Sequence, residues 1–147
     1  MSIDMVPAGC TVLLLGPDQA ALEGLAQVLT GAGCRTHVAG SLLEAACEAT
    51  AAPPLVALVH RRLALTHPGI ANLPLAPGGA LVLYGAAHEA RCAHSPAVQR
   101  ATLADLTLPM ERHRLLALVQ HLAQRALAAG RPPTPADGAV ALRAASH

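Results

Sequence analysis

The sequence predicts one doubly wound α/β domain built on a five-stranded parallel sheet. Three observations lead to this fold class. The 147 residues are enough for one domain and too few for two ordinary ones. Short apolar runs recur along the chain, and helix-like patterns alternate with them. Such alternation places parallel strands in one sheet that helices cover on both faces.

The predicted strands are short and mostly apolar. They span residues 11–15, 36–39, 55–59, 80–84 and 103–107. The first, third and fourth are continuously apolar, as expected for parallel strands buried on both faces, and the fifth is the weakest. Glycine, proline or a polar residue follows closely after each run, which is typical of a strand that ends in a turn.

Helical patterns connect the first three strands. Leucines at helical spacing follow the first strand, and Gly31 and Gly33 stop that pattern. Ser41 and Glu44 form a capping box, in which each side chain binds free backbone amides at the start of a helix. This second helix is expected to end near residues 53–54, which are both proline.

The later connections are less regular. Residues 63–79 are rich in proline and glycine, so the third helix is predicted to be degraded to a short helix or a loop. The fourth helix falls within residues 87–102, where Ser95-Pro96 suits either a cap or a kink. The clearest helix follows Pro109 and Glu111, with an apolar stripe on one face.

Composition and charge exclude several function classes. The formal net charge is +1 and no basic stretch stands out, so nothing supports binding to nucleic acid or to an anionic membrane surface. The N-terminus does not resemble a signal peptide, and no apolar run is long enough to span a bilayer, so a cytoplasmic location is expected. The cysteines lack a C-x-x-C pair and are expected to be reduced, small apolar residues. They are Cys10, Cys34, Cys47 and Cys92.

The sequence divides into an N-terminal arm at residues 1–10, a folded domain at residues 11–129 and a C-terminal tail at residues 130–147. The tail begins with a proline-rich stretch and continues into an alanine-rich end with little amphipathic organisation. We interpret it as a flexible tail. The start of a linker is an equally good interpretation.

Residues 11–127 carry a family resemblance. The run TVLLLGPDQAALEGLAQVLTGAGCRTHVAGSLLEA, a strand that ends at His60, and the segment at residues 106–110 resemble receiver domains of the CheY type. The segments TVLLLGPDQ, SPAVQ and LTLPMERHRLLALV are also similar to the pseudo-receiver of AmiR- and NasT-type antitermination regulators. The resemblance implies a flavodoxin-like sheet of order 2-1-3-4-5. It does not carry over RNA binding, because the tail is too short for the coiled coil and three-helix module of those regulators.

Active receivers of this family bind magnesium with an acidic pair after the first strand, accept a phosphoryl group on an aspartate after the third, and contact it with a hydroxyl residue and a Lys-Pro pair after the fourth and fifth. The matching positions here are Gly16, Pro17 and Asp18, then His60, Gly85, Leu108 and Pro109. One carboxylate and one imidazole do not supply the oxygen ligands and fixed cations that this chemistry needs. We therefore predict a degenerate site with no catalytic residue and no cofactor.

Three function classes follow from this interpretation. The favoured one is a phosphorylation-independent signalling or regulatory module that contacts a protein partner or a second copy of itself, to which the apolar face of the last helix would be suited. The alternative is a ligand or metal sensor in the strand-end crevice, with His60, His88 and Cys92 as weak metal candidates. An enzyme is the least favoured, because the sequence lacks a glycine-rich phosphate loop, a nucleophile elbow and paired carboxylates.

Neighbouring residues also have a plain structural interpretation. His60 is expected to be a half-exposed residue of a degenerate site with no partner that can be named. Arg61 and Arg62 are expected to form a solvated loop edge, although such a pair can recognise a phosphate or carboxylate. Tyr84 is expected to pack rather than act as a switch.

Overall fold

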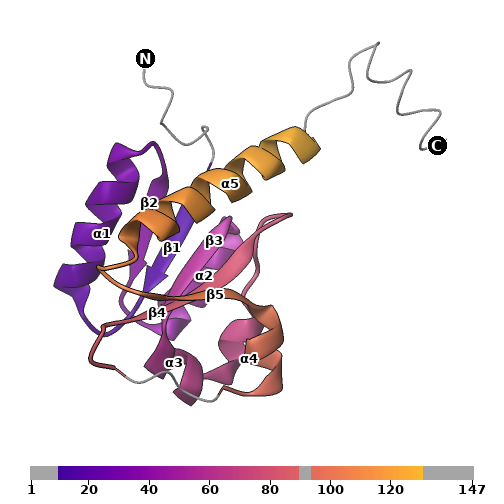
Figure 1. Cartoon of the computed structure of the whole chain (residues 1–147). Coiled ribbons are helices and arrows are strands. Elements are labelled where there is room, and N and C mark those ends of the chain that lie inside the picture. The colour runs from indigo at the N-terminus through magenta and orange to yellow at the C-terminus, as the bar shows by residue number, and fades with distance from the viewer. Residues whose placement is uncertain (1–9, 90–93, 131–147) are drawn as a thin grey trace, which may run out of the picture.

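Five parallel strands form one sheet in the computed structural model, which describes residues 10–89 and 94–130 (Figure 1). The strand order is β2-β1-β3-β4-β5, as the sequence predicted. The strands are β1 (Thr11–Leu15), β2 (Arg35–Ala39), β3 (Val56–His60), β4 (Ala80–Gly85) and β5 (Thr102–Thr107). The chain therefore has the predicted doubly wound architecture, with β1, β3 and β4 in the interior of the sheet.

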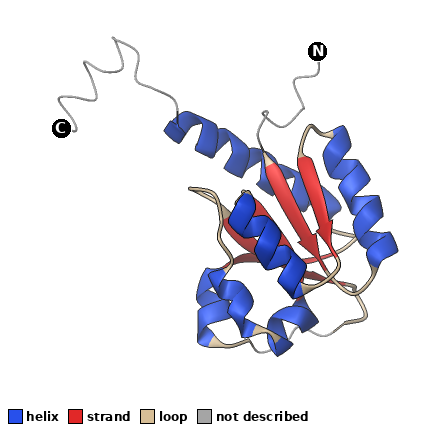
Figure 2. Cartoon of the chain, turned by 180° about the vertical axis from the view of Figure 1, so that it is seen from behind, coloured by secondary structure: helices blue, strands red, loops and turns tan. Residues whose placement is uncertain are grey.

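Helices cover both faces of this sheet (Figures 1 and 2). They are α1 (Gln19–Gly31), α2 (Leu42–Ala51), α3 (Arg61–Thr66), α4 (Pro96–Ala101) and α5 (Arg112–Gly130), with a 3₁₀ helix, η1 (Pro68–Asn72). Buried side chains of α1 and α5 share one apolar cluster with the sheet, and those of α2, α3 and α4 share the cluster on the opposite face. Two separate apolar layers thus enclose the sheet.

The helix starts follow the capping chemistry of the sequence. Asp18 accepts a hydrogen bond from the Ala21 amide at 3.1 Å and caps α1. The hydroxyl of Ser41 accepts from the Glu44 amide at 3.1 Å, which confirms the N-cap of α2. The Glu44 carboxylate accepts a hydrogen bond from the Gly40 amide at 3.0 Å, and not from the amide of Ser41, the cap residue. The capping box is therefore present, but its second hydrogen bond reaches one residue further back along the chain.

The irregular second half agrees with the sequence prediction and defines its helices more narrowly. The third connection contains the short α3 and η1, which confirms the degraded third helix. The fourth helix lies within the predicted range of residues 87–102: it starts at Pro96 with Ser95 as its N-cap, and residues 86–89 form a turn before it. Ser95-Pro96 thus marks a cap and not a kink. The predicted arm except for residue 10, and the predicted tail from residue 131, lie outside the described residues.

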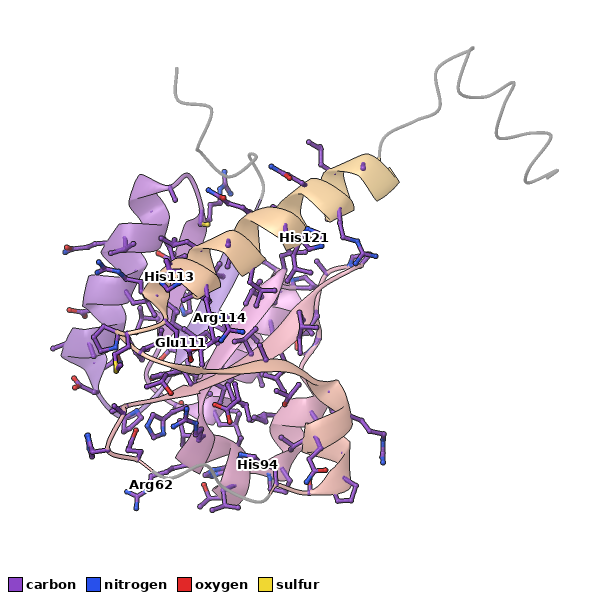
Figure 3. The ribbon with its side chains drawn as sticks, in the orientation of Figure 1. Arg62, His94, Glu111, His113, Arg114 and His121 are labelled. Carbon is purple, nitrogen blue, oxygen red and sulfur yellow. The ribbon has the colours of Figure 1, made fainter. Side chains whose placement is uncertain are left out.

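The core is centred on the inner strands. All five residues of β3 are buried, and Leu14 of β1 and Leu58 of β3 are fully enclosed. His113 and His121 of α5 are exposed (Figure 3). Among the described residues, none of the helices combines the length and the apolarity that crossing a bilayer requires.

Candidate functional site

The carboxyl ends of the parallel strands meet at one edge of the sheet, where ligands of doubly wound folds bind. The predicted positions gather there: Gly16, Pro17 and Asp18 follow β1, His60 ends β3, Gly85 ends β4, and Leu108 and Pro109 follow β5. A groove of about 560 Å³ opens between these loops and α1. Six of the seven positions line this groove, and the remaining one, Gly16, lies against Tyr84 beside it.

Tyr84 fills the space beside Gly16. A Cβ atom on Gly16 would lie 1.9 Å from the Tyr84 hydroxyl oxygen and 3.1 Å from the ring carbon that carries it. Burial raises the pKa of Tyr84, and the negative charges of Asp18 and Glu89 raise it further, so the side chain is a neutral phenol. Tyr84 packs as expected, but it also occupies the volume that a carboxylate at position 16 would need.

His60 is buried and held at both ring nitrogens, so the expectation of a half-exposed, partnerless residue is wrong. Only 6% of the residue is exposed. Its Nδ1 accepts a hydrogen bond from the Arg62 amide at 3.1 Å, and its Nε2 lies 3.0 Å from Oε1 of Glu89. A backbone amide only donates, so Nδ1 carries no proton and Nε2 donates to the carboxylate. The ring is therefore the neutral Nε2–H tautomer, and it meets Tyr84 edge to face, with centroids 5.2 Å apart.

Glu89 is a member of the site that the sequence analysis did not single out. Its Oε1 accepts a hydrogen bond from the Ala86 amide at 2.7 Å as well as the one from His60. The Ala86 amide lowers the pKa of Glu89, His60 and the nearby His88 lower it further, and burial opposes these effects. The sequence signal was an acidic residue four positions after Gly85, the last residue of β4, inside the range predicted to contain the fourth helix.

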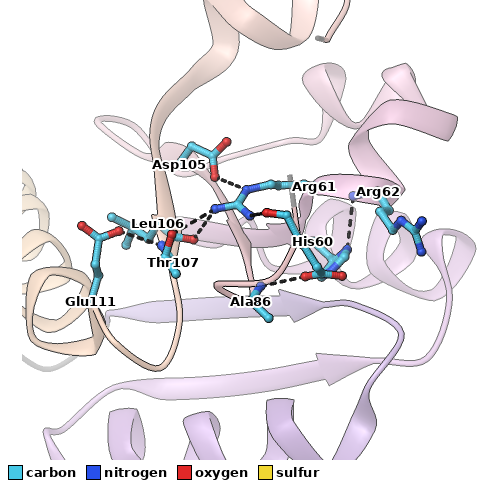
Figure 4. Close-up of polar contacts among 9 residues, drawn as sticks. His60, Arg61, Arg62, Ala86, Asp105, Leu106, Thr107 and Glu111 are labelled. Atoms are coloured by element: carbon cyan, nitrogen blue, oxygen red, sulfur yellow. Dashed lines mark hydrogen bonds and ion pairs between the residues drawn. The ribbon is translucent and has the colours of Figure 1, made fainter. Parts of the chain in front are cut away.

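Arg61 is the second buried polar residue of the site, and its expected place at a solvated loop edge is wrong. It is 2% exposed, whereas the neighbouring Arg62 is exposed as expected. The Arg61 guanidinium donates to Asp105 at 2.6 Å and to the Leu106 carbonyl at 3.1 Å, with longer contacts at 3.4 Å to the Glu89 carbonyl and the Thr107 hydroxyl (Figure 4). A buried guanidinium is tolerated because its donors find such partners.

Gly85 leaves the room for this guanidinium. A Cβ atom on Gly85 would lie 2.3 Å from a terminal nitrogen of Arg61 and 3.1 Å from a carboxylate oxygen of Glu89. A larger side chain at position 85 is therefore incompatible with the present placement of Arg61. Two side chains thus fill the space at the end of β4. They are Arg61, which directly follows β3, and Glu89, which lies in the turn after β4.

Two of the three metal candidates, His60 and His88, line the same groove. His88 lies exposed in a turn rather than on the expected helix, and Cys92 lies outside the described residues. Both ring nitrogens of His60 are already engaged. Within residues 10–89 and 94–130, the side chains of His, Cys, Asp and Glu form no cluster of three suited to a metal ion.

The sheet order, the helices on both faces and the strand-end crevice define a receiver-type, CheY-like fold. The structure is similar to the N-terminal domain of a response regulator/sensory box/GGDEF protein from Carboxydothermus hydrogenoformans, with 15% identity and a TM-score of 0.62 over 82% of this chain and 99% of that chain. It is also similar to the pseudo-receiver domain of the CikA protein, with 19% identity and a TM-score of 0.56 over 78% and 97% of the two chains.

A third similar structure is NtrX from Brucella abortus, with 14% identity and a TM-score of 0.58 over 81% of this chain. The match spans only 27% of the NtrX chain. No protein-family model matches the sequence. No curated protein matches it in sequence either. At these identities the likeness establishes the fold, and the function has to be argued from the site.

Proposed function

We propose that this chain is a cytoplasmic, receiver-like signalling module that takes up no phosphoryl group and acts through contact with a protein, without enzymatic activity. The observation that carries the proposal is that the chain's own side chains fill the positions of the phosphorylation site. Tyr84 occupies the space beside Gly16, and His60 stands at the acceptor position with both ring nitrogens bonded.

The chemistry of these groups argues against phosphoryl transfer. A phosphoryl group on Nε2 of His60 would face the Glu89 carboxylate at 3.0 Å, and a group on Nδ1 would displace the hydrogen bond that opens α3. Asp18, the carboxylate nearest the missing acidic pair, is committed as the N-cap of α1. Glu89, the other described carboxylate at the groove, binds the Ala86 amide and His60. Neither carboxylate stands at position 16 or 17, where an acidic pair would hold magnesium against the developing charge.

Exposed apolar side chains support a role in protein contact. Leu103 on the edge strand β5 is 53% exposed, and Leu127 of α5 is 51% exposed. Exposed apolar residues on an edge strand and an adjoining helix are a feature of interaction surfaces. A protein partner or a second copy of the chain that covers β5 and α5 is consistent with this arrangement.

The proposal is tested with the full chain, magnesium and either acetyl phosphate or beryllofluoride. We expect the intact mass to stay unchanged and the amide resonances of residues 16, 60 and 85 not to move. A receiver with an intact site serves as the positive control for both reagents. Stoichiometric phosphate on the protein, whether acid-labile or acid-stable, would refute phosphorylation independence.

One observation favours a second candidate, a ligand sensor. The groove of about 560 Å³ has the size of a small-molecule site and combines Leu22, Leu25 and Leu108 with Asp18 and Arg112 at its wall. A metal sensor has less support, because His60 is fully engaged. Metal analysis of the purified full chain, which includes Cys92, tests the metal-sensor hypothesis directly.

The finer resemblance to the AmiR and NasT type stays a proposal that rests on three sequence segments. The solved structures that resemble this chain support the receiver fold and do not support that assignment. RNA binding is no part of the proposal.

A further inference from the structure

Two cysteines that lie far apart in the sequence meet at the start of β1 and β2. Thr11 pairs with Arg35 in the register of these parallel strands, and the Arg35 amide donates to the Cys10 carbonyl at 2.8 Å. One step back along both strands places Cys10 opposite Cys34. Adjacent strands lie about 4.8 Å apart, which falls within the Cα separation of roughly 4.4–6.8 Å that disulfides require.

The two side chains point to the same face of the sheet and touch. Both belong to the apolar cluster beneath α1 and α5, together with Val12 and Leu14 of β1. They are 4% and 5% exposed, and the interaction of the two thiols shifts the pKa of both, lowering that of Cys10 and raising that of Cys34. Cys47, the other described cysteine, is exposed on α2. The fold therefore pairs two thiols that sequence spacing did not relate.

We propose that Cys10 and Cys34 form a redox-responsive thiol pair that closes to a disulfide in the presence of a low-molecular-weight disulfide such as oxidised glutathione. This inference is independent of the proposed signalling role, because it concerns the opposite, amino end of the strands.

The reaction is a pair of thiol–disulfide exchanges. The Cys10 thiolate attacks one sulfur of oxidised glutathione, which forms a mixed disulfide and releases one glutathione thiolate. The Cys34 thiolate then attacks the Cys10 sulfur, which forms the Cys10–Cys34 bond and releases the second glutathione. The two protein thiols lose two electrons and two protons, and oxidised glutathione gains them.

The order of the two attacks follows from the contact between the thiols. The interaction with Cys34 lowers the pKa of Cys10, whereas that same interaction and burial raise the pKa of Cys34. Cys10 is therefore the thiol that ionises first, and the thiolate is the attacking species. Because both sulfurs are nearly enclosed, exchange requires local opening at the start of β1 and β2.

The disulfide would close a loop that contains β1 and α1, the helix that lines the groove through Leu22 and Leu25. A cross-link of this kind restricts the unfolded chain. We expect the thermal midpoint of the oxidised chain to exceed that of the reduced chain by roughly 5–15 °C.

The test uses the full chain with Cys47→Ser and Cys92→Ser, so that only the proposed pair can react. The sequence has no lysine and its first arginine is Arg35, so trypsin releases both cysteines in one peptide, residues 1–35. After equilibration in glutathione buffers and alkylation, we expect this peptide to carry no alkyl group and to be two hydrogens lighter than the reduced, unalkylated peptide. Reduction with dithiothreitol followed by a second alkylation should then add two alkyl groups. The single variant Cys34→Ala should instead retain glutathione on Cys10.

A second arm separates native geometry from mere proximity along the chain. The equilibrium constant for disulfide formation against glutathione is measured in native buffer and in concentrated urea. If the fold holds the thiols together, this constant should be at least tenfold larger in native buffer, because a disulfide that stabilises the fold is itself favoured by folding. Equal constants in both solvents, or cysteines that remain fully alkylated or gain only single oxygens, would overturn the proposal.

Discussion

The hydroxyl of Tyr84 occupies the position from which a side chain on Gly16 would extend, with only 1.9 Å left for a Cβ atom. Tyr84 reaches this place because β4 ends beside β3, whose last residue, His60, is its register partner. The ring is wedged between His60 and Gly16, which leaves little freedom to move aside. The space for a side chain at position 16 is therefore taken by Tyr84, so the two positions have to change together.

Gly16→Ala should destabilise the fold because the new methyl group overlaps the Tyr84 hydroxyl. We expect a loss of about 2 kcal/mol in the free energy of unfolding, as in other overpacked sites. The double variant Gly16→Ala with Tyr84→Phe should recover most of this loss, because the remaining contact is with a ring carbon at 3.1 Å. Urea unfolding of the parent, the single variants and the double variant gives the coupling energy.

Gly24→Ala is the matched control for this cycle. Gly24 lies on the exposed side of α1, and a Cβ atom there would meet nothing within 4 Å. This variant should be as stable as the parent or more stable by up to about 1 kcal/mol, because alanine favours a helix. A parent-like Gly16→Ala variant would show that Tyr84 moves away freely.

Restoring phosphorylation should require removal of Tyr84 as well as replacement of the missing groups. The double variant His60→Asp, Leu108→Lys restores an acceptor and a cation but no acidic pair, so it should take up no phosphate. Adding Gly16→Asp and Pro17→Asp supplies carboxylates whose first atom at position 16 meets Tyr84. Only the variant that also carries Tyr84→Ala should accept phosphate from acetyl phosphate, since groups that act as a unit are strongly non-additive.

Intact-mass measurement of the three variants decides between the possibilities. Uptake by the double variant would mean that Asp18 or backbone carbonyls already hold magnesium. Phosphate uptake by the variant with four changes would mean that the Tyr84 side chain moves aside for an aspartate at position 16. The coupling energy between Gly16→Ala and Tyr84→Phe should then also be small.

The fold was predictable from the sequence because its signals are local. Apolar runs, the Ser41 cap and the prolines of the third connection act over a few residues, and the sheet order followed from the family resemblance. The fourth helix could be placed only loosely, within residues 87–102, for the same reason. Residues 87–95 carry no strong local breaker, and the turn at residues 86–89 is held by Glu89, which binds a histidine 29 residues away.

The contents of the site were not predictable because they depend on contacts between strands. From the sequence alone, Arg61 is expected to be exposed. In the fold, β5 places Asp105 beside it, although the two residues lie 44 positions apart in the sequence. The two glycines at strand ends were the usable signal, since Gly16 and Gly85 leave the space that Tyr84 and Arg61 fill. The Cys10–Cys34 pair likewise follows from strand register and from nothing in the spacing of the cysteines.

Arg61→Ala should be among the most damaging single substitutions in the domain. It removes a buried charge that binds Asp105 and the Leu106 carbonyl, so we expect a loss of about 3–5 kcal/mol in the free energy of unfolding. Arg61→Lys keeps the charge but presents fewer donors in a different geometry, so it should fall between the parent and the alanine variant. Arg62→Ala, at the exposed neighbouring position, should stay within about 0.5 kcal/mol of the parent.

Chemical denaturation of these three variants checks the assignment. If Arg61→Ala and Arg62→Ala unfold at the same denaturant concentration, the guanidinium does not hold the ends of β3 and β5 together. The amide resonances of Leu106 and Thr107 provide a second measurement, because they should shift in Arg61→Ala and remain in place in Arg62→Ala.

Glu89 should contribute stability that is lost in acid. Its pKa in the folded chain lies below the ordinary value of 4.5, chiefly because the Ala86 amide binds the carboxylate. The unfolded chain therefore binds a proton first as the pH falls, so the contribution is complete above about pH 5 and disappears as the pH drops through 4.5 to the folded pKa. Glu89→Gln keeps an acceptor oxygen but loses the charge, and it should cost about 1 kcal/mol at pH 6.

The measurement is the difference in the free energy of unfolding between the parent and Glu89→Gln at several pH values from 6 to 3. This difference should shrink toward zero at the acid end, because the protonated Glu89 and the glutamine then bind the Ala86 amide alike. Glu23→Gln, an exposed change on α1, supplies the control for the general acid sensitivity of the chain and should follow the parent throughout. A Glu89→Gln difference that stays constant across this range would show that the charge of Glu89 does not stabilise the turn that binds His60.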